Sequence, residues 1–364
     1  MMYAGFLICL AGLIFLGTTH LRQDAAAPSG SLAPEPPART APLPFRGVSW
    51  VAGDSIKEEQ LEALKQHHIN WIAQTPFGWQ RHYRSPEVTL NRANRVYWGE
   101  RDKGLVLTTQ LAKKHGIKTL LKPHIWLMDR TDGKWLGDIS MESEERWQEW
   151  FGHYRTFILH YARLAEEHQM EAFCIGTELY TPAVTHEKEW RELIREIRQL
   201  YGGQLTYAAN WYKEYEEIRF WDALDFIGIQ AYFPLTQKEN PSLEELKKGW
   251  NRHLGQIEKV QRKFRKPVVF TEAGYKSTPD AAIEPWKWPD RQAGEMVQSD
   301  ETQALAYETL FQTFWSKPYF SGLFLWKWYP RIREGRRDRF DFTPQHKPAE
   351  KVMARWYGSA VGSP

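Results

Sequence analysis

Eight short apolar segments alternate with longer amphipathic segments along most of the 364-residue chain. Short apolar runs with few charges are typical of parallel strands that are covered on both faces. The expected strands span residues 46–51, 70–74, 117–123, 172–176, 205–209, 226–230, 267–271 and 322–326. Eight strands alternating with helices predict an α/β fold, a (β/α)8 barrel, with an open doubly wound sheet as the alternative. No glycine-rich phosphate-binding fingerprint follows any of these segments, which disfavours the open sheet.

Helical periodicity fills the intervals between the expected strands. The expected helices span residues 55–67, 105–115, 144–168, 187–200, 243–264, 302–315 and 348–356. Ser55, with Glu58 three residues later, has the pattern of an N-terminal capping box, so it predicts the start of the first helix.

The first 44 residues differ in composition from the rest of the chain. An apolar run over residues 3–17 is short for a membrane span and suits the core of a secretion signal, so residues 1–22 are predicted to be a signal peptide. An uncleaved N-terminal anchor, which would tether the protein to a membrane, is the alternative. Residues 23–44 are rich in Ala, Pro and Ser and predict a linker, which leaves residues 45–364 as the folded domain. Either leader predicts export, to the periplasm, the cell surface or the medium.

Composition narrows the classes of function. The net charge of +3, from 48 basic and 45 acidic residues, does not favour a nucleic-acid partner. Cys9 and Cys174 are the two cysteines, and with one of them in the leader they allow neither a disulfide framework nor a cysteine metal site in the domain. No HExxH motif or nucleophile elbow is present, so we expect neither a metal, nor a cofactor, nor a serine nucleophile. The 18 tryptophans favour a carbohydrate cleft and a Trp-rich core about equally.

Two glutamates follow apolar strands directly, at the end of the barrel where active sites collect. Glu178 follows the fourth expected strand and Glu272 follows the seventh. A lone glutamate at a strand end is usually a surface group or the partner of an arginine. Strands four and seven face each other across a barrel mouth, however, so two carboxyls there could reach the roughly 5–5.5 Å separation of retaining glycosidases. One would then be the nucleophile and the other the general acid and base.

Polar and aromatic residues at the other strand ends are the predicted substrate contacts. Lys122 and His124 would bind sugar hydroxyls or tune Glu178, although a histidine there is often only a structural hydrogen bonder. Tyr232 would donate a hydrogen bond to Glu272 or pack on the barrel rim. Asn210 would bind a hydroxyl, and Trp126 and Trp211 would stack on sugar rings. Trp326 would form the floor under the reacting sugar or, alternatively, cap the barrel core.

Together these residues resemble the clan A glycoside hydrolases, and more narrowly glycoside hydrolase family 113, whose characterised members are mainly β-1,4-mannanases. The segments that carry the resemblance are RGVSW (46–50), LKPHIW (121–126), IGTEL (175–179), DFIGIQAYFPL (225–235), VVFTEAGY (268–275), FLWKWYP (324–330) and TPQHKPAEKV (343–352). The resemblance implies a TIM barrel that cleaves an oligo- or polysaccharide.

The resemblance also implies individual roles. Glu178 would be the acid/base, Glu272 the nucleophile, and Trp50 and Trp326 would contact the sugar next to the cleaved bond. Many clan A enzymes have an asparagine immediately before the acid/base, where it binds the sugar 2-hydroxyl. Here that position is Thr177, which leaves open the residue that recognises the 2-hydroxyl.

Four hypotheses for function follow. The first is an exported, endo-acting, retaining β-1,4-mannanase, and the second is another clan A activity, namely an exo-β-mannosidase, glucanase or xylanase. The third is a non-catalytic sugar-binding barrel, and the fourth is a structural wall-associated protein. Loops over residues 76–101, 129–141 and 275–300 would shape the mouth into a groove or a pocket, with sugar contacts in or beside them from Trp126, Trp135, Trp286 and Trp288.

Overall fold

The computed structural model describes residues 45–90, 96–289, 296–332 and 339–359. The predicted signal peptide or anchor (1–22) and linker (23–44) lie outside the described residues. Within the described ranges, no helix has both the length and the apolar character that crossing a membrane requires.

Eight parallel strands close into a barrel, as the sequence predicts. They are β1 (Phe45–Trp50), β2 (Trp71–Gln74), β5 (Lys118–Leu121), β7 (Ala172–Thr177), β8 (Gln204–Asn210), β9 (Ile227–Gln230), β10 (Val268–Ala273) and β11 (Phe320–Trp328). The strands follow one another around the barrel in chain order, and β11 pairs with β1 to close it. The (β/α)8 TIM barrel is therefore confirmed, and the open doubly wound sheet is excluded.

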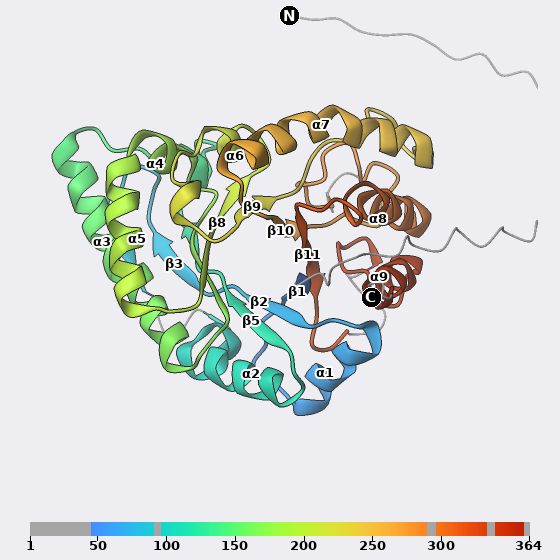
Figure 1. Ribbon diagram of the computed structural model, residues 1–364, viewed down its shortest axis with the longest axis horizontal. Helices are drawn as coiled ribbons and strands as arrows, with labels where there is room; N and C mark the ends of the chain where they lie inside the picture. The colour runs from blue at the N-terminus through green and yellow to red at the C-terminus, as the bar shows by residue number, and fades with distance from the viewer. Residues whose placement is uncertain (1–44, 91–95, 290–295, 333–338, 360–364) are drawn as a thin grey trace, which may run out of the picture. The chain divides into compact units, whose positions relative to one another are not determined.

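Helices surround the strands (Figure 1). The larger ones are α1 (Glu58–Glu62) with the 3-10 turn η1 (Ala63–His67), α2 (Asp102–Lys114), α3 (Glu144–Glu167), α5 (Glu187–Leu200), α7 (Leu243–Phe264), α8 (Asp300–Phe314) and α9 (Pro348–Gly358). All seven predicted helices are present. Two short helices that the sequence did not predict, α4 (Tyr180–Thr185) and α6 (Glu214–Glu217), follow β7 and β8 at the mouth.

The predicted cap at Ser55 is wrong. The residue that precedes α1 is Lys57, whose backbone N–H donates to the side-chain oxygen of Gln60 at 2.8 Å. Gln60 stands three residues after Lys57, so the chain uses a later polar pair than the one that the sequence pattern suggested.

A small sheet occupies part of the predicted loop 76–101. It joins β3 (Phe77–Gln80), β4 (Val88–Thr89) and β6 (His124–Leu127), with β3 parallel to β6. β6 continues from β5 after Pro123, which has no N–H to donate. The backbone of Lys122 still bonds to Gln74 at 2.8 Å, and that of His124 bonds to Pro76 at 2.9 Å. The small sheet thus extends one side of the barrel beyond its mouth.

Large side chains fill the lower interior of the barrel. Phe45 packs against Trp71 and Phe226, with ring centroids 4.6 and 5.1 Å apart, close to the N-terminal ends of their strands. The same cluster contains Cys174, whose burial raises the pKa of its thiol to about 11, as expected for an inert buried cysteine. This end of the barrel is therefore filled, and the large cavity that contains Glu178 and Glu272 lies at the opposite end of the strands.

The closure between β1 and β11 depends on Gly322. Its φ is +121°, and a Cβ built on it would lie 2.0 Å from the carbonyl oxygen of Phe45. We expect Gly322→Ala to lower the free energy of unfolding by about 2 kcal/mol or more, because both the backbone conformation and the space require glycine. Urea denaturation followed by tryptophan fluorescence measures this change.

Gly152, in the middle of α3, is the matched control. Nothing lies within 4 Å of a Cβ built there, so Gly152→Ala should stabilise the domain by about 0.5–1 kcal/mol through helix propensity. Equal effects of the two substitutions would contradict this account of the barrel closure.

Candidate active site

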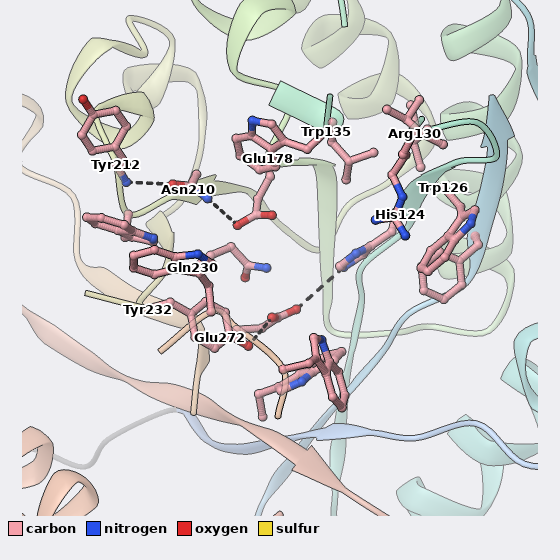
Figure 2. Close-up of a pocket in the computed structure, with 18 of the residues that line it drawn as sticks. His124, Trp126, Arg130, Trp135, Glu178, Asn210, Tyr212, Gln230, Tyr232 and Glu272 are labelled. Atoms are coloured by element: carbon pink, nitrogen blue, oxygen red, sulfur yellow. Dashed lines mark hydrogen bonds and ion pairs between the residues drawn. The ribbon is translucent and has the colours of Figure 1, made fainter. Parts of the chain in front are cut away.

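A cavity of about 740 Å³ lies at the C-terminal ends of the strands, and Figure 2 shows its lining. Eight of the ten predicted site residues line it: Glu178, Glu272, His124, Trp126, Asn210, Trp211, Tyr232 and Trp326. These residues come from β6, β8, β10, β11 and the segments that follow β7, β8 and β9. The alternation of strands and helices therefore brings together side chains that lie far apart in the sequence.

Glu178 leaves β7 in an uncommon backbone conformation. Its φ is +54°, a value that non-glycine residues seldom adopt. Its N–H donates to the carbonyl of Ala208 at 2.9 Å, and the side-chain amide of Asn210 donates to its Oε1 at 2.9 Å. Burial and the nearby charge of Glu272 raise the pKa of Glu178 to about 7. Glu178 can therefore hold a proton near neutral pH.

Glu272, on β10, lies in the opposite electrostatic environment. The hydroxyl of Tyr232 donates to its Oε2 at 2.7 Å, as the sequence predicted, and Lys122 forms an ion pair with its Oε1. Burial alone would raise the pKa of Glu272, but the charge of Lys122 and hydrogen bonds from Lys122 and Gln230 lower it below the usual glutamate value. Glu272 is therefore held as a carboxylate.

The two carboxyls share one cavity (Figure 2). One tends to keep its proton and the other to lose it, although both are glutamates that line the same cavity. Two titratable groups whose surroundings push their pKa values apart are the usual sign of a general acid beside a nucleophile or base. The arrangement can deliver a proton from one side of a bound substrate and a negative charge from the other.

His124 lies beside Glu272, with 3.9 Å between its Nε2 and the carboxylate Oε1. Burial and the charge of Lys122 lower the pKa of this histidine to about 3, so the imidazole is neutral at working pH. Among the described residues, its Nε2 has no hydrogen-bond partner. His124 lines the cavity, but its Nε2 is buried, so the predicted contact with a sugar hydroxyl stays a prediction.

Aromatic side chains flank the carboxyl pair on two sides. Trp211 and Trp286 stack with ring centroids 5.0 Å apart, and Tyr212 lies on their side of the cavity. Trp126 and Arg130 lie on the other side (Figure 2), with the guanidinium 4.9 Å from the ring of Trp126. The loop tryptophans named from sequence, Trp135, Trp286 and Trp288, also line the cavity.

Two predicted contacts lie elsewhere. Lys122 is fully buried beneath the cavity, and its charge acts on Glu272 rather than on Glu178 alone. Trp50 belongs to the large core cluster with Val48 and does not line the cavity. Thr177 is also turned away, since its hydroxyl donates to the carbonyl of Pro123 at 3.3 Å.

Several lining residues were not predicted. Gln230 ends a predicted strand, and a polar residue in that position was the available indication. Phe77, Arg130, Tyr212 and Phe342 lie on segments whose path the sequence pattern does not specify. In the part of the chain that the structure describes, no three metal-binding side chains gather at one place.

Comparison with known proteins places this geometry in a family. Residues 49–359 match the family model described as Glycoside Hydrolase Family 113. A family 113 beta-1,4-mannanase solved as a complex is 28% identical, with a TM-score of 0.72 over 86% of this chain and 99% of that one. A family 113 beta-mannanase from Alicyclobacillus acidocaldarius, solved with ManMIm, is 29% identical, with a TM-score of 0.73 over 86% and 97% of the two chains.

More distant structures share the fold alone. A Ruminococcus gnavus beta-glucuronidase is 16% identical, with a TM-score of 0.55 over 87% of this chain and 50% of that one. Comparison with curated protein sequences gave no match. The match over most of the domain, with the likeness to two mannanase structures, identifies the chain as a glycoside hydrolase that belongs to Glycoside Hydrolase Family 113.

Proposed function

We propose that the protein is a retaining, endo-acting β-1,4-mannanase in which Glu178 is the acid/base and Glu272 the nucleophile. The observation that carries the proposal is the opposite tuning of these two carboxyls within one aromatic-lined cavity. A double displacement requires one protonated and one ionised carboxyl at the start of the reaction.

In the first step, Glu272 attacks the anomeric carbon while Glu178 donates its proton to the departing glycosidic oxygen. The bond from that carbon to the leaving sugar breaks, and an ester to Glu272 forms. In the second step, Glu178, now ionised, takes a proton from water. The water oxygen attacks the anomeric carbon and releases Glu272 as a carboxylate, which restores both groups to their starting states.

The partners of Glu272 support the nucleophile role. Lys122, which follows β5, and Tyr232, which follows β9, hold its two oxygens, so the carboxylate is ionised and oriented before substrate binds. Glu178 has no cation in hydrogen-bond contact among the described residues, and the amide of Asn210 is neutral.

The choice of mannan rests on the relatives. Two solved structures described as family 113 beta-1,4-mannanases are 28% and 29% identical to this chain. Aromatic surfaces on both sides of the carboxyl pair would accommodate sugars on either side of the cleaved bond, which supports cleavage within a polymer. The leader further leads us to propose export of the enzyme, with a membrane tether if the leader is uncleaved.

The substrate is tested by product analysis. The domain that begins at Phe45 should release oligosaccharides from β-1,4-mannan and much less from xylan or β-glucan. Chromatography of timed digests measures this, and short oligosaccharides of several lengths at early times indicate endo action. Release of monosaccharide alone would contradict endo action, and preferential release from xylan or β-glucan would contradict the choice of mannan.

The mechanism is tested by substitution and stereochemistry. Glu178→Gln should lower kcat/KM on mannan by roughly 10²- to 10⁴-fold, the usual contribution of a general acid, and Glu272→Gln should lower it at least as far. NMR of the first products should show retention of the anomeric configuration. Inversion, or near-wild-type turnover by either folded variant, would rule out the double displacement.

The pH profile of kcat/KM tests the tuning of the pair. Activity needs Glu178 protonated, so it should fall as pH rises through about 7; it needs Glu272 ionised, so the acid limb should lie below the usual glutamate pKa. In Lys122→Met both limbs should move to higher pH. The acid limb should move further than the alkaline limb, by about one pH unit or more in total, because Lys122 contacts Glu272 directly.

Lys238→Met is the control for this shift. Lys238 pairs with Glu245 at the surface, with 2.6 Å between Nζ and Oε1, and does not line the cavity. Its loss should leave both limbs in place. An unchanged acid limb in Lys122→Met would show that this lysine does not set the ionisation of Glu272.

A further inference from the structure

A third carboxyl lies behind Glu178 and outside the cavity lining. Glu214, the first residue of α6, is fully buried. We propose that Glu214 is a positioning residue for the proton transfer by Glu178, and this inference rests on the acid/base role proposed above. It acts through Asn210, which binds the carboxyl of Glu178, and through Tyr207, which binds the backbone of the next residue, Leu179.

Both oxygens of Glu214 are occupied by donors from β8. The hydroxyl of Tyr207 donates to Oε1 at 2.6 Å, and the backbone N–H of Asn210 donates to Oε2 at 2.6 Å. The turn after β8, where Lys213 has a φ of +60°, brings Glu214 back against the strand that it has just left. Glu214 therefore fixes the position of the C-terminal end of β8.

From Asn210 the connection to Glu178 is direct. The side-chain Oδ1 of Asn210 accepts from the N–H of Tyr212 at 2.8 Å, and its Nδ2 donates to Glu178 at 2.9 Å. Because Oδ1 is already paired with a donor, the amide can present only its NH₂ group to Glu178. The orientation of this amide, and with it the direction of the Glu178 carboxyl, depends on the backbone position that Glu214 fixes.

From Tyr207 a second connection reaches the backbone next to Glu178. The hydroxyl of Tyr207 accepts the N–H of Leu179 at 2.7 Å while it donates to Glu214. Leu179 directly follows Glu178, whose φ of +54° needs support from its surroundings. Glu214 thus holds the acid/base from two directions, through its side-chain partner and through the next peptide.

A carboxyl is a costly group to bury for a purely structural purpose. Burial raises the pKa of Glu214 above the usual glutamate value, the hydrogen bonds from Tyr207 and Asn210 oppose this shift, and the charge of Glu178 adds to it, so the protonation of Glu214 is coupled to that of Glu178. An amide or an apolar side chain would fill the same space without this coupling. The hydrogen bonds that connect Glu214 to Glu178 therefore offer a functional explanation for a buried carboxyl at this position.

The experiment compares two leaving groups. Glu214→Gln should lower kcat/KM by roughly 10- to 100-fold for a β-1,4-linked mannooligosaccharide, since small misplacement of a catalytic group costs about that much. With the 2,4-dinitrophenyl glycoside of the same sugar, kcat/KM should change less than about threefold, because dinitrophenolate leaves without a proton and kcat/KM reports only the first displacement. KM for the mannooligosaccharide should change little, whereas kcat and KM for the dinitrophenyl glycoside should fall together, because the second displacement still needs Glu178 as a base.

Three further variants make the outcome decisive. Tyr207→Phe removes the hydroxyl that joins Leu179 to Glu214, and should show the same dependence on leaving group; it carries the test if Glu214→Gln does not fold. Glu308→Gln alters a buried carboxyl that pairs with Arg355 and does not line the cavity, and should spare both substrates. Thermal unfolding of each variant checks the fold.

Glu178→Gln separates the two proposals. If it shows no dependence on leaving group, the acid/base role of Glu178 is wrong. The other outcome is that Glu178→Gln shows this dependence while the folded variants Glu214→Gln and Tyr207→Phe do not. If kcat/KM of those two variants falls equally for both substrates, or falls for neither, Glu214 does not position the proton transfer, and only this inference is overturned.

Discussion

The buried ion pair between Lys122 and Glu272 is the interaction on which the site depends. Isolated charges cost several kcal/mol each to bury, so each of these two charges is stabilised in this place by the other. Below them the barrel is filled by Phe45, Trp71 and Phe226. The pair thus stands where an apolar interior changes into a polar cavity floor. It also keeps Glu272 ionised, which makes one interaction serve both the packing of the barrel and its chemistry.

The same interaction explains how two glutamates acquire different properties. Glu272 receives a cation and a phenol, whereas Glu178 receives a neutral amide and the repulsion of Glu272 itself. Each ionised carboxyl disfavours the other, so the lysine decides which of them carries the charge. Because Lys122 directly follows β5 and Glu272 lies on β10, the ion pair between them requires a closed barrel. An unfolded chain or an open sheet would not bring them together.

The sequence predicted the features that depend on local patterns. Strand composition located β7 and β10, and hence Glu178 and Glu272, because a buried parallel strand is recognisable from its own residues. It did not predict the partner of Lys122 or the core position of Trp50, because these depend on how separate segments pack. α6 is only four residues long and has no periodicity to detect, so Glu214 was missed with it. Ser55 failed for another reason, since a second polar pair nearby, at Lys57 and Gln60, offered an equivalent cap.

The aromatic side chains that line the cavity are partly exposed to solvent, which is unfavourable in free energy until a ligand covers them. Trp126, Trp286 and Trp288 are 42%, 39% and 50% exposed, although other tryptophans of this chain are completely buried. Exposed indole rings lose the burial that normally stabilises them. They gather around the two carboxyls rather than being scattered over the surface, and so they form apolar faces on which sugar rings can stack. The tryptophan excess in the composition therefore has two physical origins, a core built from large rings and a mouth that supplies binding surface to a polysaccharide.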